Sequence, residues 1–185
     1  MVDCCSFYWD GRTDFVPFTS NGARASELEG AMMNVQLDRL PGMIRAMRKQ
    51  KQRILAETAD TGLQPIQANS LEWECGSHVG YLLPSAEQAE RFAALAGGFV
   101  TAKTGRHVYT EWDPIFAHQG AHHPALNPFT LPANRKCRKQ YTKDMCSKSL
   151  EILGRAVLIG THPDRKAAET RALIKRIGQA AAEVL

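Results

Sequence analysis

Two capping boxes constrain the fold of this chain more than any other feature of the sequence. Ser26 and Glu29 form the first box, and Ser85 and Gln88 form the second. In such a box the serine oxygen accepts a hydrogen bond from the third amide of the helix, and the Glu or Gln side chain bonds back to the serine amide. Each box therefore predicts the first turn of a helix. Apolar runs of strand length separate the helical segments, which is typical of a fold that mixes helices and strands.

The segment that begins at the first box has apolar residues at helical spacing on both sides of Pro41. Proline has no amide hydrogen to donate, and it suits the first turn of a helix. We therefore expect one long interrupted helical region made of two helices, at 26–38 and 41–58.

The densest basic stretch is Arg45–Arg53, in the second of these helices. A helix places such charges on a solvated face beside its apolar stripe, and we expect Lys49 and Lys51 on that face. The stretch contains no aromatic residue, and the net charge of the whole chain is only +4. Proteins that bind nucleic acids usually interleave basic and aromatic residues or contain a recognisable reading module. We therefore do not expect nucleic-acid binding.

The rest of the chain alternates short apolar runs with helical segments. Strands are expected at 78–83, 99–102, 107–110 and 156–159, with a further short strand within 58–69. Helices are expected at 85–97, 139–153 and 163–184, the last with Leu173, Ile177, Ala181 and Val184 on one face. Four prolines predict a long loop at 111–135. These elements indicate an α/β or α+β domain at 26–185, with helices on one side of a small sheet, after an aromatic-rich N-terminal arm at 1–25.

Composition narrows the class of protein. A chain of 185 residues with 44% hydrophobic content can bury the core of one ordinary domain. Its five cysteines are an odd number without C-x-x-C spacing, which is simplest to explain by free thiols in a reducing cytoplasm. The longest clean apolar run, at 156–159, is far too short to cross a bilayer. We expect a soluble cytoplasmic protein that does not contact a membrane.

Three histidines, His118, His122 and His123, are close enough in sequence to suggest a metal site. Prolines and a glycine among them disfavour a helix, and no cysteine or carboxylate completes a four-ligand set at ordinary zinc spacing. We expect no metal.

Three sequence blocks indicate a family. They are SNGARASELEGAMMNVQLDRLPGMIRAMRKQKQRI at 20–54, GRHVYTEWDPIFAHQGAHHPALNPF at 105–129 and CSKSLEILGRAVLIGTHPD at 146–164. In this order they resemble the DegT-like family of fold-type-I aminotransferases. The first block is similar to the family pattern G-x-N-x-R-M-x-E-L-Q-A-A. The third is similar to the closing pattern C-P-x-S-x-D-I-L-x-R-x-V-x-I-x-x-H-P-D, although Ser147 replaces its proline.

The resemblance implies an enzyme activity that this chain does not complete by itself. Family members use pyridoxal 5'-phosphate to convert keto groups on sugars, nucleotide-linked sugars or cyclitols into amines. The lysine that holds the cofactor precedes the first block in the family, whereas every lysine here lies at residue 49 or beyond. We therefore expect the C-terminal subunit of a split aminotransferase, paired with a lysine-bearing large-domain chain in a heterodimer or heterotetramer. A non-catalytic scaffold or regulatory paralogue, or a truncated form of a full-length enzyme, are the alternatives.

The resemblance also implies site residues, although it assigns no catalytic residue to this chain. Asn21, Gly22 and Arg24 correspond to the turn that meets the cofactor phosphate. The family asparagine falls on Gly22 when the blocks are aligned on Arg24, so either position could serve, and an Asn-Gly pair also favours a plain tight turn. His107, Tyr109 and Trp112 belong to a segment that approaches the keto substrate in relatives. Otherwise they are strand residues and a partly buried indole.

Overall fold

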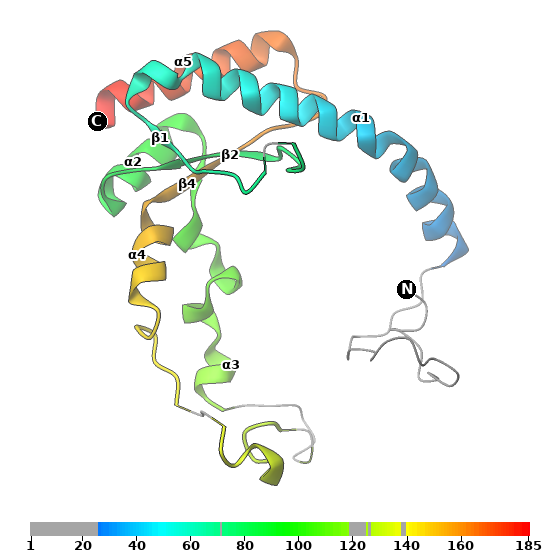
Figure 1. The fold of residues 1–185 in the computed structure, drawn as a ribbon, viewed down its shortest axis with the longest axis vertical. Coiled ribbons are helices and arrows are strands. Elements are labelled where there is room, and N and C mark those ends of the chain that lie inside the picture. Colours follow the sequence, from blue (N-terminus) through cyan, green and yellow to red (C-terminus); the bar gives the residue numbers. More distant parts are fainter. Residues whose placement is uncertain (1–25, 71, 119–124, 126, 138–139) are drawn as a thin grey trace. The chain divides into compact units, whose positions relative to one another are not determined.

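The computed structural model describes residues 26–70, 72–118, 125, 127–137 and 140–185 (Figure 1). The chain divides into two compact units, Met1–Gly42 and Met43–Leu185. The arm expected at 1–25 lies outside the described residues, so its boundary with the domain stays a prediction.

Helix α1 (Glu27–Glu57) begins at the first capping box. Glu29 N donates to Ser26 Oγ at 3.2 Å, and Ser26 N donates to Glu29 Oε2 at 2.7 Å, as the sequence predicts. The expected division into two helices is wrong, because α1 continues through Pro41. A proline removes only one helical hydrogen bond, and the flanking Leu, Met, Arg and Gln residues are good helix formers. The helix is exposed at this point, so water can hydrate the carbonyl that loses its partner.

Four short strands form an antiparallel sheet in the order β1-β2-β4-β3. They are β1 (Gln64–Pro65), β2 (His78–Leu82), β3 (Phe99–Val100) and β4 (Ala156–Gly160). The central pair runs from His78 opposite Gly160 to Leu82 opposite Ala156. Both central strands agree with the sequence expectation. Alternate residues point to opposite faces of a strand, which places Val79, Tyr81, Val157 and Ile159 together in the core.

Helices α2 (Ala86–Ala96) and α5 (Ala167–Val184) pack against each other, and α2 also contacts the sheet. Gln88 N donates to Ser85 Oγ at 3.1 Å, and Gly97 ends α2 in the left-handed region with φ 77°. The second capping box is only half formed, because the Gln88 amide donates to the Val184 carbonyl instead. The four apolar residues expected on one face of α5 are all buried: Leu173, Ile177, Ala181 and Val184. Ile54 of α1 joins the same core.

The segment after β3 differs from the expectation. Residues 107–110 are not a strand; they lie in 3-10 turns η4 (Gly105–His107) and η5 (Tyr109–Glu111), after η3 (Thr101–Lys103). Gly105 has a φ of 62°, and the amide of Val108 donates to the Gly105 carbonyl at 2.8 Å. These local bonds satisfy the backbone without a strand partner.

The remaining elements are short. They are η2 (Ala59–Thr61), α3 (Asp113–Phe116), η7 (Pro132–Asn134) and α4 (Ser147–Arg155). The helix expected from residue 139 therefore begins only at Ser147, because turns at Thr142–Met145 and Asp144–Ser147 precede it. The described residues form an α+β fold with a small antiparallel sheet. None of the described helices has the length and apolar content that a membrane span requires.

Candidate functional site

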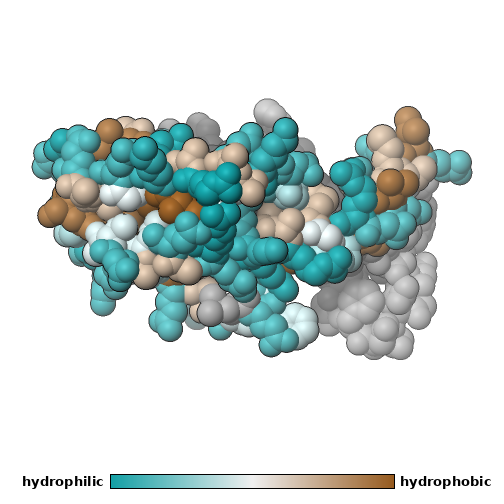
Figure 2. Space-filling model, turned by 90° about the horizontal axis from the view of Figure 1, so that it is seen from above, coloured by the Kyte–Doolittle hydropathy of each residue, from teal (hydrophilic) through white to brown (hydrophobic). Residues whose placement is uncertain are grey.

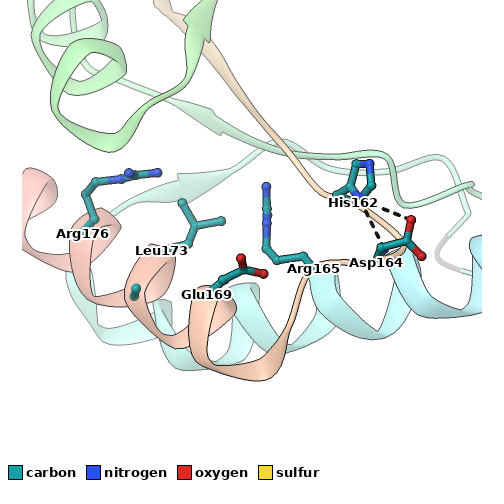
Figure 3. Close-up of a pocket in the computed structure, with 7 residues that line it drawn as sticks. His162, Asp164, Arg165, Glu169, Leu173 and Arg176 are labelled. Carbon is teal, nitrogen blue, oxygen red and sulfur yellow. Dashed lines mark hydrogen bonds and ion pairs between the residues drawn. The ribbon is translucent and has the colours of Figure 1, made fainter.

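A cavity of about 630 Å³ lies along the first turns of α5 and the loop that precedes it (Figure 3). Its volume is in the range of small-molecule sites. The lining residues are His162, Asp164, Arg165, Glu169, Ala172, Leu173 and Arg176. Most of them recur at spacings of three and four residues, which places them on one face of α5. The cavity therefore combines an apolar floor at Leu173 with charged groups around it.

A buried amide from α1 holds one end of the cavity. Gln50 is only 8% exposed, and its Oε1 accepts hydrogen bonds from Arg165 Nη1 at 3.0 Å and from the His162 amide at 3.2 Å. Its Nε2 donates to the His162 carbonyl at 3.2 Å. Arg165 Nη1 also donates to the Gly160 carbonyl at 3.0 Å. These bonds fix the Arg165 guanidinium beside the end of the central strand β4.

Arg176 defines the opposite end of the cavity. Its Nε donates to the Ala96 carbonyl at 2.9 Å, so the guanidinium lies over the last turn of α2. A cation is favoured there because the carbonyl end of a helix is electronegative. Figure 3 shows the Arg176 side chain pointing from α5 toward the side of the cavity where Leu173 lies. Within the part of the chain that the structure describes, neither Arg165 nor Arg176 forms a salt bridge.

Two carboxylates line the same cavity. Glu169 Oε2 accepts from the Lys166 amide at 2.7 Å, which secures the first turn of α5. Asp164 Oδ2 lies 4.0 Å from His162 Nδ1, and that nitrogen accepts from the Asp164 amide at 3.2 Å. The His162 side chain therefore bonds to the backbone of its own loop before α5. The guanidinium groups present paired donors that suit a carboxylate or a phosphate, and the carboxylates limit the excess of positive charge.

The cavity does not fit pyridoxal phosphate as a reacting cofactor. No lysine is among its lining residues, so no amine is placed to hold the cofactor's carbonyl carbon. The residues expected at the cofactor phosphate, Asn21, Gly22 and Arg24, lie outside the described residues, and their role stays a prediction. We assign no reaction step to the cavity.

The residues expected at the substrate lie on the turns after β3 and do not line the cavity. Tyr109 Oη donates to the Lys143 carbonyl at 2.6 Å and accepts from the Cys146 amide at 3.2 Å, which ties η5 to the start of α4. His107 is exposed, and Trp112 is 47% exposed. Their contact with substrate stays a prediction. Of the three histidines considered for metal, only His118 is described, and the described residues contain no group that could hold a metal ion.

Sequence reasoning did not identify Gln50 or Lys51 as interior residues. Both lie in the basic run that was expected on a solvated face, but Lys51 is 8% exposed and forms an ion pair with Glu74 at 2.5 Å. That expectation is wrong for Lys51 and holds for Lys49, which is exposed. Met47 in the run and Ile54 just after it lie on the same side of the helix as Gln50 and Lys51. The spacing of these four residues is the sequence pattern that indicates a buried side of the helix.

Comparison of the sequence with models of known protein families finds no match, and comparison with curated proteins finds none either. The aminotransferase resemblance therefore depends on the three sequence blocks alone.

Proposed function

We propose that this chain is the C-terminal subunit of a pyridoxal-phosphate-dependent aminotransferase that acts on a keto-sugar, a nucleotide-linked keto-sugar or a cyclitol. The blocks at 20–54, 105–129 and 146–164 support the family. Every lysine of the chain lies at residue 49 or beyond, whereas the family's cofactor lysine precedes the first block. The lysine then comes from residues outside this sequence, and we propose a second chain as its source.

The observation that most supports a partner is the exposed apolar surface of α1. Leu28, Met32 and Val35 follow one another at spacings of four and three residues, and each is at least 55% exposed. Met33, Leu37 and Leu40 repeat the same spacing on another side of the helix and are 42–69% exposed. Figure 2 shows hydrophobic side chains at the surface of this part of the helix. Large exposed apolar patches mark interaction sites in soluble proteins.

Burial of these side chains against a partner would favour association. Full burial of one large apolar side chain contributes about 1.5–3 kcal/mol, against which the loss of translational and rotational freedom is set. Two rows on different sides of one helix suit a helix that packs between surfaces of a partner. We propose that the lysine-bearing chain covers both rows in a heterodimer or heterotetramer.

In this proposal the chain itself provides the surface that binds the partner and the residues that recognise the cofactor phosphate and the substrate. When bound, pyridoxal phosphate supplies the electron sink of the reaction, and the partner holds most of it. The α1 surface fixes the partner, and Asn21 or Gly22, with Arg24, meets the cofactor phosphate. His107, Tyr109 and Trp112 border the keto substrate. We place the complex in the cytoplasm, since the described cysteines are all free and exposed thiols, which suit a reducing compartment.

Co-expression with the neighbouring open reading frames of the gene tests the proposal. We expect a lysine-bearing chain to co-purify with this one, together with the visible absorbance of bound pyridoxal phosphate and aminotransferase turnover. Leu37→Asp should weaken the association by about 1–3 kcal/mol in a titration of the two chains, because it places a charge in the apolar row. Asn34→Asp on the same exposed stretch of helix should leave the affinity within about 0.5 kcal/mol.

Two outcomes would decide against the enzyme subunit. If no lysine-bearing chain binds and the isolated protein stays monomeric, the split enzyme is wrong. If the complex forms but Asn21→Ala and Arg24→Ala leave its turnover unchanged, the scaffold or regulatory paralogue is the better description. A longer in-frame coding sequence with the lysine upstream would instead identify a truncated enzyme.

A further inference from the structure

The cavity along α5 contains two opposite charges that do not neutralise each other. Arg176 and Glu169 both line it, and both side chains are exposed, so a ligand can reach them. Among the residues that the structure describes, neither side chain forms a salt bridge. Figure 3 shows Leu173 between them along α5. The cavity therefore has a guanidinium toward one end, a carboxylate toward the other, and an apolar surface between the two.

The end of α2 holds the Arg176 guanidinium away from the carboxylate. Its Nε donates to the Ala96 carbonyl at 2.9 Å, and a Cβ on Gly97 would lie only 2.9 Å from its Nη2. Helical neighbours meet at spacings of three and four residues, and none of the residues at those spacings from Arg176 is acidic. Glu169 is two turns away, which corresponds to roughly 10 Å along the helix axis. The fold thus positions this guanidinium without giving it an ionic partner.

The Glu169 carboxylate is also kept apart from a cation. Its Oε2 accepts from the Lys166 amide at 2.7 Å, which holds it at the first turn of α5. The second guanidinium of the cavity belongs to Arg165, and its Nη1 donates to Gln50 Oε1 and to the Gly160 carbonyl, both at 3.0 Å. Gln50 is buried in α1, so the position of Arg165 is set by the fold. A carboxylate has more lone pairs than one amide uses, and a ligand can bind the others.

We propose that this cavity binds a small molecule that has an anionic group at one end and an ammonium group at the other. The Arg176 guanidinium binds the phosphate or carboxylate through paired donors, and Glu169 binds the ammonium. Both carboxylates of the cavity, Asp164 and Glu169, lie toward the start of α5, which assigns the ammonium to that end. The body of the ligand packs on Leu173, and a cavity of about 630 Å³ is large enough to hold it.

Two kinds of small molecule have this chemistry. In an amino-sugar phosphate a sugar ring separates the phosphate from the amine, and in a long amino acid a methylene chain separates the carboxylate from the amine. Glucosamine-6-phosphate and ε-aminocaproate represent the two kinds. Binding of either compound supports the site, and the ratio of the two affinities shows which kind the cavity prefers.

Isothermal titration calorimetry on the full chain at low salt measures these affinities. Glucose-6-phosphate lacks the amine and glucosamine lacks the phosphate, whereas hexylamine and hexanoate are the matching analogues of ε-aminocaproate. Each analogue should bind about tenfold more weakly than its parent compound, because it loses one charge-assisted contact. The measurement needs no partner chain, so its result is independent of the proposed aminotransferase.

Two substitutions test the two ends of the site separately. Glu169→Gln removes the charge but retains an oxygen that can accept from the Lys166 amide. It should weaken binding of the parent compound about tenfold and abolish its advantage over the analogue without the amine. Arg176→Gln should in the same way abolish the advantage over the analogue without the anionic group.

Lys175→Gln is the matched control, because it removes a positive charge from an exposed neighbouring position on α5 that does not line the cavity. It should leave the affinity within about twofold. Circular dichroism checks that all three variants fold. The proposal is wrong if neither parent compound binds at millimolar concentration, if the analogues bind as tightly as their parents, or if Glu169→Gln and Arg176→Gln both leave the affinity unchanged.

Discussion

At the scale of the residue, the buried side-chain amide of Gln50 holds two distant segments of the chain together. It accepts hydrogen bonds from Arg165 and from the His162 amide, and it donates to the His162 carbonyl. A buried glutamine is stable only when such partners satisfy it. The same side chain therefore connects α1 to the loop before α5 and orients one guanidinium of the candidate cavity.

Gln50→Ala should lower the free energy of unfolding by about 2–3 kcal/mol, because the His162 amide and carbonyl lose their partner in a part-buried setting. Urea denaturation monitored by circular dichroism measures the change. Gln52→Ala is the control, since Gln52 is an exposed glutamine on the same helix and its removal should change stability by less than about 0.5 kcal/mol. Equal effects of the two substitutions would show that the Gln50 bonds contribute little.

At the scale of the element, α1 shows that a local breaker does not always end a helix. Pro41 removes one hydrogen bond from a helix of 31 residues, and good helix formers on both sides maintain the rest. The capping box at Ser26 and Glu29 secures the first turn. Residues 26–42 bury little of their surface, so this part of α1 depends on local bonds and, in our proposal, on the partner.

Pro41→Ala should stabilise the helix around residues 37–45 by about 1–3 kcal/mol, because it restores the amide hydrogen and removes the clash with the preceding turn. Hydrogen exchange measured by mass spectrometry should then show slower exchange in this segment of the isolated chain. Exchange in α5, which does not contain the substitution, serves as the internal reference. Unchanged or faster exchange at 37–45 would mean that the proline has a favourable role that the helix geometry does not reveal.

At the scale of the whole molecule, one core joins the second half of α1, the sheet, α2 and α5. Tyr81 is fully buried at its centre; its ring contacts Phe92 edge-on at 5.9 Å, and its hydroxyl lies 2.8 Å from Thr58 Oγ1. Burial raises the pKa of the Tyr81 hydroxyl, and the hydrogen bond between Tyr81 and Thr58 opposes this only in part. The folded protein thus holds the tyrosine proton more tightly than the unfolded chain does.

The free energy of unfolding should therefore fall as the pH rises above about 10, where an unfolded tyrosine begins to lose its proton while folded Tyr81 keeps it. Below that pH the contribution is fully present. Tyr81→Phe should remove this part of the pH dependence and should cost about 1 kcal/mol at neutral pH, since the hydroxyl pair is lost. Urea denaturation at a series of pH values measures both effects. An equally steep fall in the variant would show that another group controls the alkaline transition.

The sequence by itself determined the helix starts at Ser26 and Ser85, the two central strands and the buried face of α5, because capping and periodicity depend only on residues a few positions apart. Only the tertiary structure decided that Gln50 and Lys51 are interior residues. Their partners, His162 and Glu74, are 112 and 23 positions away in the chain. It also decided that residues 107–110 form 3-10 turns instead of a strand. Contacts between distant segments form only when the chain has folded, and local patterns do not record them.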